Sequence, residues 1–599
     1  MSTPIEDYAM LGDCRSAALV CRNGSIDWLC LPRFDSDAVF AALLGTPEHG
    51  RWLLCPDVPS RSSRRYLDGS LVLETTFETE EGAVRLQDFM VASHDGHTHS
   101  HLIRRVCGVR GRVPMKTELV MRFGHGRIVP WVTQDADGLR AVAGPDQLVL
   151  RTPLEMEGQD MTSTAQFTLG EGESTWFVLS HGPSHLEAPP SVDPEEALST
   201  TLSFWEEWSG ACAQAGRWSE QVKRSLVVLK GLSYLPTGAI IAAPTASLPE
   251  QIGGERNWDY RYCWLRDSAF VLLALMNAGF REEAGAFRDW VKRAVAGTPD
   301  QLQALYSVDG VRRLEEWSAD WLPGYEDSRP VNFGNAAARQ FQLDVYGELI
   351  SLFEVARMRG MPAGDYGNEL ERAFLLELEK RWHDPDEGIW EVRSGRRHFT
   401  HSKMMAWLAF HLASDNDESG FSDEDRARWA AQAEAVHAEI LERGLHRDGY
   451  FVQSYDSEEL DAALLLMPLI GFLPGDDPRL IATVEAIQAR LTVDGLVQRY
   501  STHGSADGLP PGEGTFLACS FWLVEALVMI GRLDEATTLY DNLHGLCNDV
   551  GLLAEEYDPQ TKRMLGNFPQ GYSHVALVNA AYRLNDADNT RRTSAEVHP

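Results

Sequence analysis

Two glutamates stand at the edges of apolar segments in the part of the chain that reads as a series of helices. Glu391 follows Trp390, and Glu513 lies between Gly512 and Gly514. Two carboxyl groups held across a pocket can break a glycosidic bond, because one protonates the departing oxygen and the other activates water on the opposite face of the sugar. The two residues therefore suit acid–base hydrolysis of an acetal.

The neighbours of each glutamate favour such a role. An indole beside Glu391 would remove water from its carboxyl group and favour the protonated form, which suits a general acid. Flanking glycines would let the backbone bring Glu513 into a cavity that bulkier neighbours would block. Each residue also has a plainer interpretation, as a solvated glutamate favoured at the start of a helix.

An arginine–aspartate pair, Arg266 and Asp267, precedes another apolar helical segment. Its fork geometry could bind neighbouring sugar hydroxyls, or the pair could be a structural ion pair. Aromatic residues in loops or at helix edges could stack on a sugar ring, although a core role is commoner for any one of them. They are Trp258, Tyr260, Tyr262, Trp264, Trp317 and Trp321, with Trp390 beside Glu391. Further polar candidates are Arg329, His398, His401 and Lys403.

The sequence lacks the motifs of several other kinds of functional site. His398 and His401 are three apart, but no matching acidic pair accompanies them, so no metal site is predicted. The sequence contains no Gly-x-Ser-x-Gly motif, no P-loop and no Gly-x-Gly-x-x-Gly fingerprint. No cofactor is predicted, and activation by phosphate or Mg²⁺ cannot be read from the sequence.

The amino-acid composition restricts the kinds of partner that the protein is expected to bind. With 54 Lys+Arg against 88 Asp+Glu the net charge is −34, a field that repels nucleic acid and anionic membranes but is compatible with a neutral substrate. No secretory signal and no apolar run of about 18 residues is visible. The nine cysteines form no CxxC pair. A reduced, cytoplasmic protein is expected, and the sequence leaves its oligomeric state open.

The 599 residues predict about two to four domains. Residues 1–190 read as short alternating strands, for example on both sides of a turn at Glu81-Gly82, and predict an antiparallel β-sandwich. Residues 191–218 read as a helical linker. From residue 219 the period becomes 3.6 and predicts roughly twelve helical segments, among them segments that begin near residues 300, 335 and 459. These segments fit a closed ring of helix pairs with long loops gathered over one end. We expect this catalytic domain to span 219–590 and a frayed tail to cover 591–599.

At these residues the sequence resembles glycoside hydrolase family 15, the glucoamylase and bacterial trehalase family. The resemblance extends over nearly the whole chain, and the order of its segments makes a chance match very improbable. The segments are Ile5–Tyr8, Gly24–Asp35, Trp258–Asp267, Trp321–Val331, Gly388–Glu391, Glu513–Phe516 and Gly566–Gln570.

The resemblance implies a β-sandwich followed by an (α/α)6-barrel catalytic domain and an inverting mechanism. Glu391 falls where the family carries its general acid, and Glu513 where it carries its general base. Arg266 and Asp267 match an arginine–aspartate pair at the first sugar subsite. Fungal members carry a second acidic residue directly after the general acid, whereas this chain has Val392 at that position. The chain therefore lacks a carboxylate that could help to bind the next sugar ring.

The implied activity is cleavage of a terminal α-glucosidic bond. The lack of a starch-binding appendage favours a small soluble α-glucoside, with α,α-trehalose the expected substrate and the ends of 1,4-α-glucans or maltooligosaccharides the alternative. Two other classes of protein fit these residues less well. An (α/α)-barrel phosphorylase would need an anion site instead of a second carboxylate, and an inactive sugar-binding protein would have lost one of the two glutamates.

Overall fold

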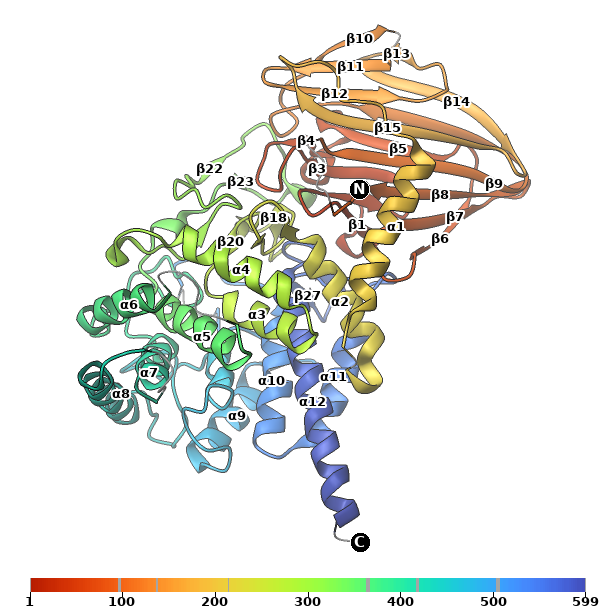
Figure 1. Ribbon diagram of the computed structural model, residues 1–599. Helices are drawn as coiled ribbons and strands as arrows, with labels where there is room; N and C mark the ends of the chain where they lie inside the picture. Colours follow the sequence, from red (N-terminus) through yellow and green to blue (C-terminus); the bar gives the residue numbers. More distant parts are fainter. Residues whose placement is uncertain are drawn as a thin grey trace.

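The computed structural model describes residues 2–94, 99–135, 138–213, 215–361, 367–415, 420–502 and 507–597. The N-terminal third folds into antiparallel strands, and the rest of the chain is mainly helical (Figure 1). The β domain lies over one end of the helical domain. This order of domains confirms the fold class predicted from the sequence.

The β domain has two layers that share one long strand, β9. The strand order is β1-β2-β3-β5-β9-β15-β12-β11-β10, with β4 beside β3, β8 and β14 beside β9, β7 beside β8, β6 beside β7 and β13 beside β14. Trp52 on β5 meets Phe177 on β15 edge to face between the layers. The strands are β1 Tyr8–Gly12, β2 Ala17–Cys21, β3 Ser25–Cys30, β4 Ala38–Phe40, β5 Arg51–Pro56, β6 Arg61–Tyr66, β7 Leu73–Glu78, β8 Gly82–Met90, β9 His101–Val120, β10 Trp131–Asp135, β11 Gly138–Ala143, β12 Asp146–Arg151, β13 Glu157–Gln159, β14 Thr162–Gly170 and β15 Ser174–Pro183.

Strand β9 changes partners along its length. Its first half pairs with β8 and β15, and its second half pairs with β5 and β14. At the change, Gly111 adopts a φ of +66°, and a Cβ there would lie 2.0 Å from the carbonyl oxygen of Glu81. Glycine at this position therefore allows the bend by which one strand joins both layers.

The predicted turn at Glu81-Gly82 is confirmed, since β7 and β8 pair across it with Phe77 opposite Val84. Helix α1 (Pro194–Gly210) falls in the predicted linker and begins after Asp193, whose side chain accepts hydrogen bonds from two backbone amides of the first turn. Its Ala197 and Leu198 pack against strand residues of the β domain, so α1 is part of that domain's core.

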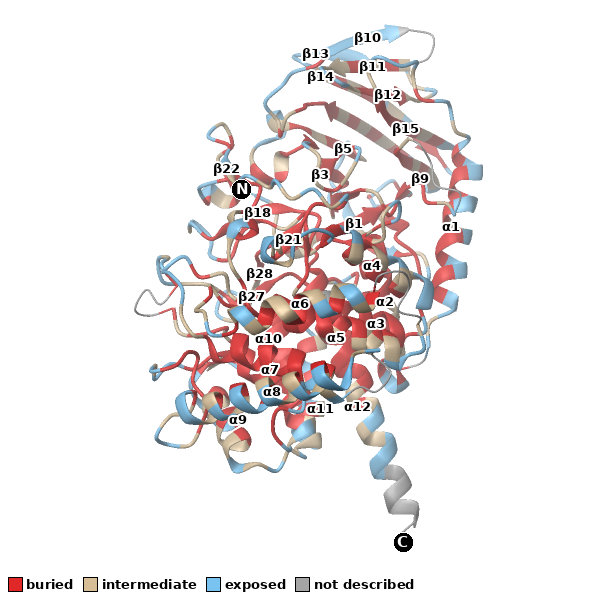
Figure 2. Ribbon diagram, turned by 60° about the vertical axis from the view of Figure 1, so that its left-hand side comes forward, coloured by how far each residue is buried: buried red, intermediate tan, exposed pale blue. Residues whose placement is uncertain are grey.

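The helical domain is a closed double ring. Each inner element packs against the next, and the last inner helix packs against the first. The inner elements are α3 Ser268–Asn277, α5 Asp344–Met358, α7 Thr400–Asp415, the 3₁₀ helix η9 Ala462–Leu466, α10 Leu517–Met529 and α12 Gly571–Val597. The outer helices are α2 Ser219–Gly231, α4 Arg281–Ala294, α6 Gly367–Arg381, α8 Asp423–Arg443, α9 Pro478–Arg490 and α11 Leu533–His544. Figure 2 shows α5, α7 and α10 buried along most of their length, whereas α8 and α9 expose one face.

Three helices predicted near residues 300, 335 and 459 are only short 3₁₀ turns, at Pro299–Gln301, Ala336–Arg339 and Ala462–Leu466. Pro468 lies two residues beyond the last of these turns. It prevents the turn from extending into a longer helix, because proline interrupts the helical hydrogen bonds. The helix expected near 335 begins later, at Asp344. At the C-terminus, α12 runs to Val597 where a frayed tail was expected, and residues 598–599 lie outside the described chain.

All six inner elements run in the same direction, because an outer helix returns the chain between each inner element and the next. Their first residues and the preceding loops therefore gather at one end of the ring. The β domain holds these loops: the Trp28 indole donates to the carbonyl of Pro244 at 2.8 Å, and Arg261 donates to the carbonyl of Ser36 at 2.6 Å. The rigid scaffold thus positions one cluster of loops.

Candidate active site

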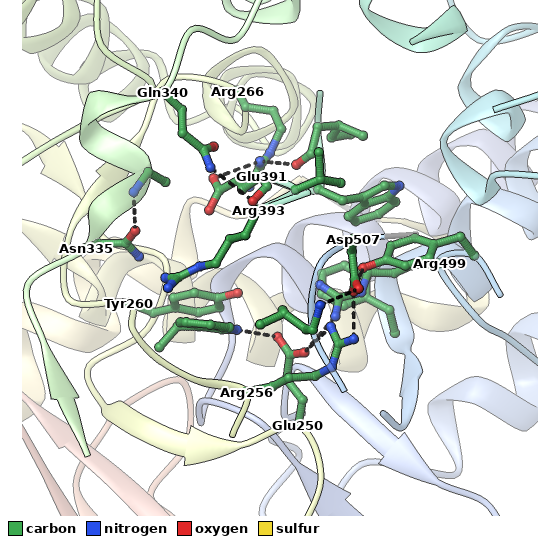
Figure 3. A pocket seen from close by; sticks show the side chains of 18 of the residues that line it. Glu250, Arg256, Tyr260, Arg266, Asn335, Gln340, Glu391, Arg393, Arg499 and Asp507 are labelled. Carbon is green, nitrogen blue, oxygen red and sulfur yellow. Dashed lines mark hydrogen bonds and ion pairs between the residues drawn. The ribbon is translucent and has the colours of Figure 1, made fainter. Parts of the chain in front are cut away.

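A polar pocket opens among the loops that precede the inner helices (Figure 3). Residues at the starts of three inner helices reach it: Arg266 before α3, Phe516 before α10 and Tyr572 in α12. The predicted Glu391 and Trp390 also line it. The remaining charged and aromatic lining residues are Glu250, Arg256, Trp258, Tyr260, Arg393, Arg499, Tyr500 and Asp507.

Glu391 is held by two donors on one oxygen. The Trp264 indole donates to Oε1 at 2.7 Å, and the Arg266 guanidinium lies 3.3 Å from the same atom. Arg266 also donates to the carbonyl of Ile389 at 2.6 Å, which fixes the turn that carries the glutamate. Glu391 itself has a φ of +57°, a conformation that costs free energy for a non-glycine residue and is common at functional sites. Its side chain stays 21% exposed.

The predicted arginine–aspartate pair is formed beside Glu391. Arg266 donates to Asp267 at 3.1 Å, and Asp344, the first residue of α5, lies near the same guanidinium. Burial raises the pKa of Asp267, and it raises the pKa of Asp344 to about 6, although Arg266 lowers both. This side of the pocket therefore holds three carboxyl groups around one arginine.

Another cluster of carboxyl groups lies around Arg256 and Arg499. Glu513 accepts both hydrogen bonds of the Arg499 fork, at 2.7 and 3.2 Å, and lies 3.3 Å from Arg256. Its side chain has no exposed surface, and Glu513 is not among the residues that line the pocket. Glu250 does line it, with hydrogen bonds from the Trp258 indole at 3.0 Å and from Arg499 at 2.7 Å.

Two more buried glutamates, Glu555 and Glu556, belong to this cluster. Burial, with a contribution from Glu250, raises the pKa of Glu555 to about 8 and that of Glu556 well above its usual range. Glu555 accepts a hydrogen bond from the Asn567 amide at 3.2 Å on one oxygen, and its other oxygen has no hydrogen-bond partner among the described residues. The hydroxyl group of the pocket residue Tyr260 lies beside this carboxyl group and, as a hydrogen-bond donor, lowers its pKa.

Oxygens of Glu250, Glu513 and Glu556 approach one another within 4.8 Å, close enough to surround a metal ion. The guanidinium of Arg499 lies within 2.7 Å of Glu250 and Glu513 and 3.5 Å from Glu556. Since the arginine already supplies the positive charge, these residues do not fit a cation site as they stand.

Trp390 is fixed by its ring nitrogen, which donates to Asp461 at 2.8 Å. Its indole packs against Phe516, and the Arg499 guanidinium lies 5.5 Å from the ring centre. Trp390 therefore joins the Glu391 turn to the side of the pocket that carries Arg499.

Three predicted binding residues lie elsewhere. Tyr262 is buried, 7% exposed, and neighbours Asp259 rather than the pocket. Trp321 donates to the carbonyl of His125 at 3.0 Å and so joins the two domains. Arg329 is exposed and donates to the carbonyl of Pro323 at 3.2 Å. None of the three is among the residues that line the pocket in the described chain.

Four residues of this region were not predicted from the sequence: Glu250, Arg256, Arg499 and Glu555. Glu250 and Arg499 are 249 positions apart, so no local motif connects them. Glu555 carried a weak signal: two adjacent glutamates follow the apolar Leu552–Ala554 and stand shortly before the Gly566–Gln570 segment.

Comparison with known proteins agrees with this architecture. Residues 216–582 match the model of glycosyl hydrolases family 15, and residues 1–205 match a trehalase-like N-terminal domain. Trehalases of Mycolicibacterium smegmatis and Mycobacterium tuberculosis are 39% and 38% identical over 100% of this chain, which covers 93% and 92% of their lengths. A trehalase of Thermoplasma volcanium is 33% identical over 97% of this chain and 94% of its own.

Among solved structures, a bacterial glucoamylase complexed with acarbose matches with a TM-score of 0.68 over 98% of this chain and 96% of its own. Its sequence identity is 14%, so the match concerns the fold. The family match and the trehalase relatives, together with a polar pocket lined by carboxyl groups, identify the chain as a glycosidase. The chain belongs to glycosyl hydrolase family 15. In the part of the chain that the structure describes, no helix has the length and apolar character needed to span a membrane.

Proposed function

We propose that this glycosidase hydrolyses α,α-trehalose to two molecules of glucose, with inversion at the attacked carbon. The observation that carries the substrate is the similarity to trehalases over essentially the whole chain, at 33–39% identity. The N-terminal match to a trehalase-like domain supports it from a part of the chain that lies outside the barrel. The geometry of the pocket supports the reaction type.

Glu391 is the general acid in this proposal. Trp264 and Arg266 both contact Oε1, which leaves Oε2 for the proton that the glycosidic oxygen receives. The carboxyl group is partly exposed, as required of a group that touches substrate. Arg266 and Asp267 bind the hydroxyls of the sugar whose bond breaks, and Trp390 packs against its ring.

The general base must accept a proton from water, so it needs an oxygen that no donor already occupies. Both oxygens of Glu513 are paired with Arg499, which makes it a poor acceptor as it stands. Glu555 has an oxygen without a partner, lies beside the pocket residue Tyr260, and has a pKa of about 8, near the pH at which a base works best. We therefore assign the base to Glu555, with Glu513 from the sequence as the rival.

Exo-hydrolysis of 1,4-α-glucan or maltooligosaccharide ends is the alternative function, because it would use the same carboxyl groups. The test is glucose release from trehalose, maltose and a long maltodextrin under matched conditions, with and without phosphate and Mg²⁺. The proposal expects kcat/KM for trehalose to exceed that for the glucans. A rate that rises with glucan length would instead make this a glucoamylase-type enzyme.

A further inference from the structure

A second cavity lies on the axis of the helical ring, beyond the starts of the inner helices. Its volume is about 240 Å³, and all six inner elements contribute to its lining. Most of the wall is apolar, with Leu273 from α3, Leu412 from α7 and Leu466 from η9. Met358, at the end of α5, also lines it and is 77% exposed, so the cavity reaches the surface away from the catalytic loops.

Two acceptors without donors face this cavity. Glu348 is 2% exposed and makes no hydrogen bond or ion pair with any described residue. The amide nitrogen of Asn579 donates to the carbonyl of Phe270 at 3.2 Å, while its oxygen has no partner in the described chain. The one guanidinium in the lining, that of Arg583, is already bound to Glu525 at 2.8 Å. The lining thus holds two acceptors without donors, together with the hydroxyl group of Ser351, which can donate or accept a hydrogen bond.

A buried carboxylate without a partner is costly, and burial is the main cause that raises the pKa of Glu348 well above its usual range. Asp344 and Asp267 on the catalytic side add to this effect, and Arg266 opposes it. The raised pKa therefore favours the protonated carboxyl group when the cavity contains no cation. A cation with N–H donors would replace that proton and satisfy both acceptors.

We propose that this cavity binds a small amphiphilic amine, whose ammonium group donates to Glu348 and Asn579 and whose apolar body packs against the leucines. An anion would meet the carboxyl groups of Glu348 and Glu525, and a sugar would leave its hydroxyls against apolar walls. A metal ion would find too few oxygen ligands. The volume equals about eight water molecules, similar to the seven heavy atoms of a six-carbon amine.

Binding rather than activity is the suitable measurement, because the ammonium replaces a proton and leaves the charge near Arg266 almost unchanged. Calorimetric titration and thermal unfolding at pH 7 would compare hexylammonium with hexan-1-ol and hexanoate. We expect hexylammonium to bind one per chain at least tenfold more tightly than the alcohol, and hexanoate not to bind. The binding heat should change with the ionisation enthalpy of the buffer, since a proton is released.

Three variants sharpen the test. Glu348→Gln should bring the amine to the affinity of the alcohol, and Leu412→Trp should fill the cavity and abolish binding of both. Glu354→Gln is the matched control, because Glu354 lines the same cavity but is paired with Arg357, and it should preserve the preference for the amine. Equal binding of amine and alcohol, unchanged amine binding in Glu348→Gln, or no binding at all would overturn the proposal. If Glu348→Gln does not fold, the buffer dependence and Leu412→Trp still decide it.

Discussion

Replacing Glu513 and Glu555 separately by glutamine would decide which glutamate activates water. Glu555→Gln removes the free oxygen, and we expect kcat to fall by about 10²–10⁴, the range of a positioned general base, or about 3–5 kcal/mol of activation free energy. Burial and the neighbouring Glu250 disfavour the charged form of Glu555, which accepts one backbone hydrogen bond. The isosteric amide removes that charge and can accept the same hydrogen bond, so it should leave thermal unfolding almost unchanged.

Glu513→Gln should show the opposite pattern. It removes one buried charge beside both Arg499 and Arg256, and breaking such a pair costs about 3–5 kcal/mol of stability. We expect a clear drop in melting temperature and, at temperatures where the variant stays folded, a loss of kcat of less than about tenfold.

The assay is initial glucose release from trehalose at saturating concentration, with circular dichroism melts on the same samples. Azide offers a second readout: as a nucleophile that needs no base, it should restore glycosyl transfer in Glu555→Ala but not in Glu513→Ala. A loss of 10² or more in a stably folded Glu513→Gln, with near-normal turnover in Glu555→Gln, would exclude Glu555 as the base. The base would then be Glu513.

Further predictions concern the acid, the stereochemistry and the buried charges. Glu391→Gln should lower kcat on trehalose by about 10² or more but affect α-glucosyl fluoride far less, because fluoride leaves without a proton; equal losses on both substrates would contradict an acid role. Early proton NMR spectra of trehalose hydrolysis should show α- and β-glucose in equal amounts, since inversion changes one of the two sugars, whereas retention would give α-glucose alone. Trp264→Phe removes the donor to Glu391 and should lower kcat on trehalose roughly tenfold; because Trp264 is buried, the smaller ring should also lower the melting temperature. Burial raises the pKa of Asp386 to about 7, so the folded chain keeps a proton that the unfolded chain loses above about pH 4, and this group makes stability fall as pH rises between the two values. In Asp386→Asn, melts from pH 4.5 to 7.5 should show a smaller fall; an unchanged slope would exclude the assignment.

The order of domains and the acid side of the pocket could be predicted from sequence because their signals are local. Trp390 and Glu391 are adjacent, and Arg266 and Asp267 directly precede a clear helical period. Their contacts with each other followed from the family resemblance rather than from the spacing. The predicted roles of Glu391 and Glu513 stay predictions until turnover is measured.

The other part of the site depends on contacts that no local pattern contains. Tyr260 and Tyr262 both lie among aromatic residues, yet only Tyr260 lines the pocket, because the path of a short loop decides which ring points inward. Trp321 was predicted to stack on a sugar ring, but its side chain lies at the interface between the two domains. Glu513 lies in a glycine-rich turn, which predicted a side chain that reaches a cavity. In the folded chain both of its oxygens accept hydrogen bonds from Arg499 instead.

The common direction of the inner helices has an electrostatic consequence. Each α-helix places about half a positive elementary charge at its N-terminus, so the five inner α-helices together direct roughly two and a half positive charges at the pocket. That potential opposes the positive charge which develops on a sugar during glycoside cleavage. Acidic residues at the helix starts, among them Asp267, Asp344 and Asp461, counter that potential. The helix dipoles in turn favour the ionised form of these carboxyl groups and so oppose the effect of burial, which raises their pKa.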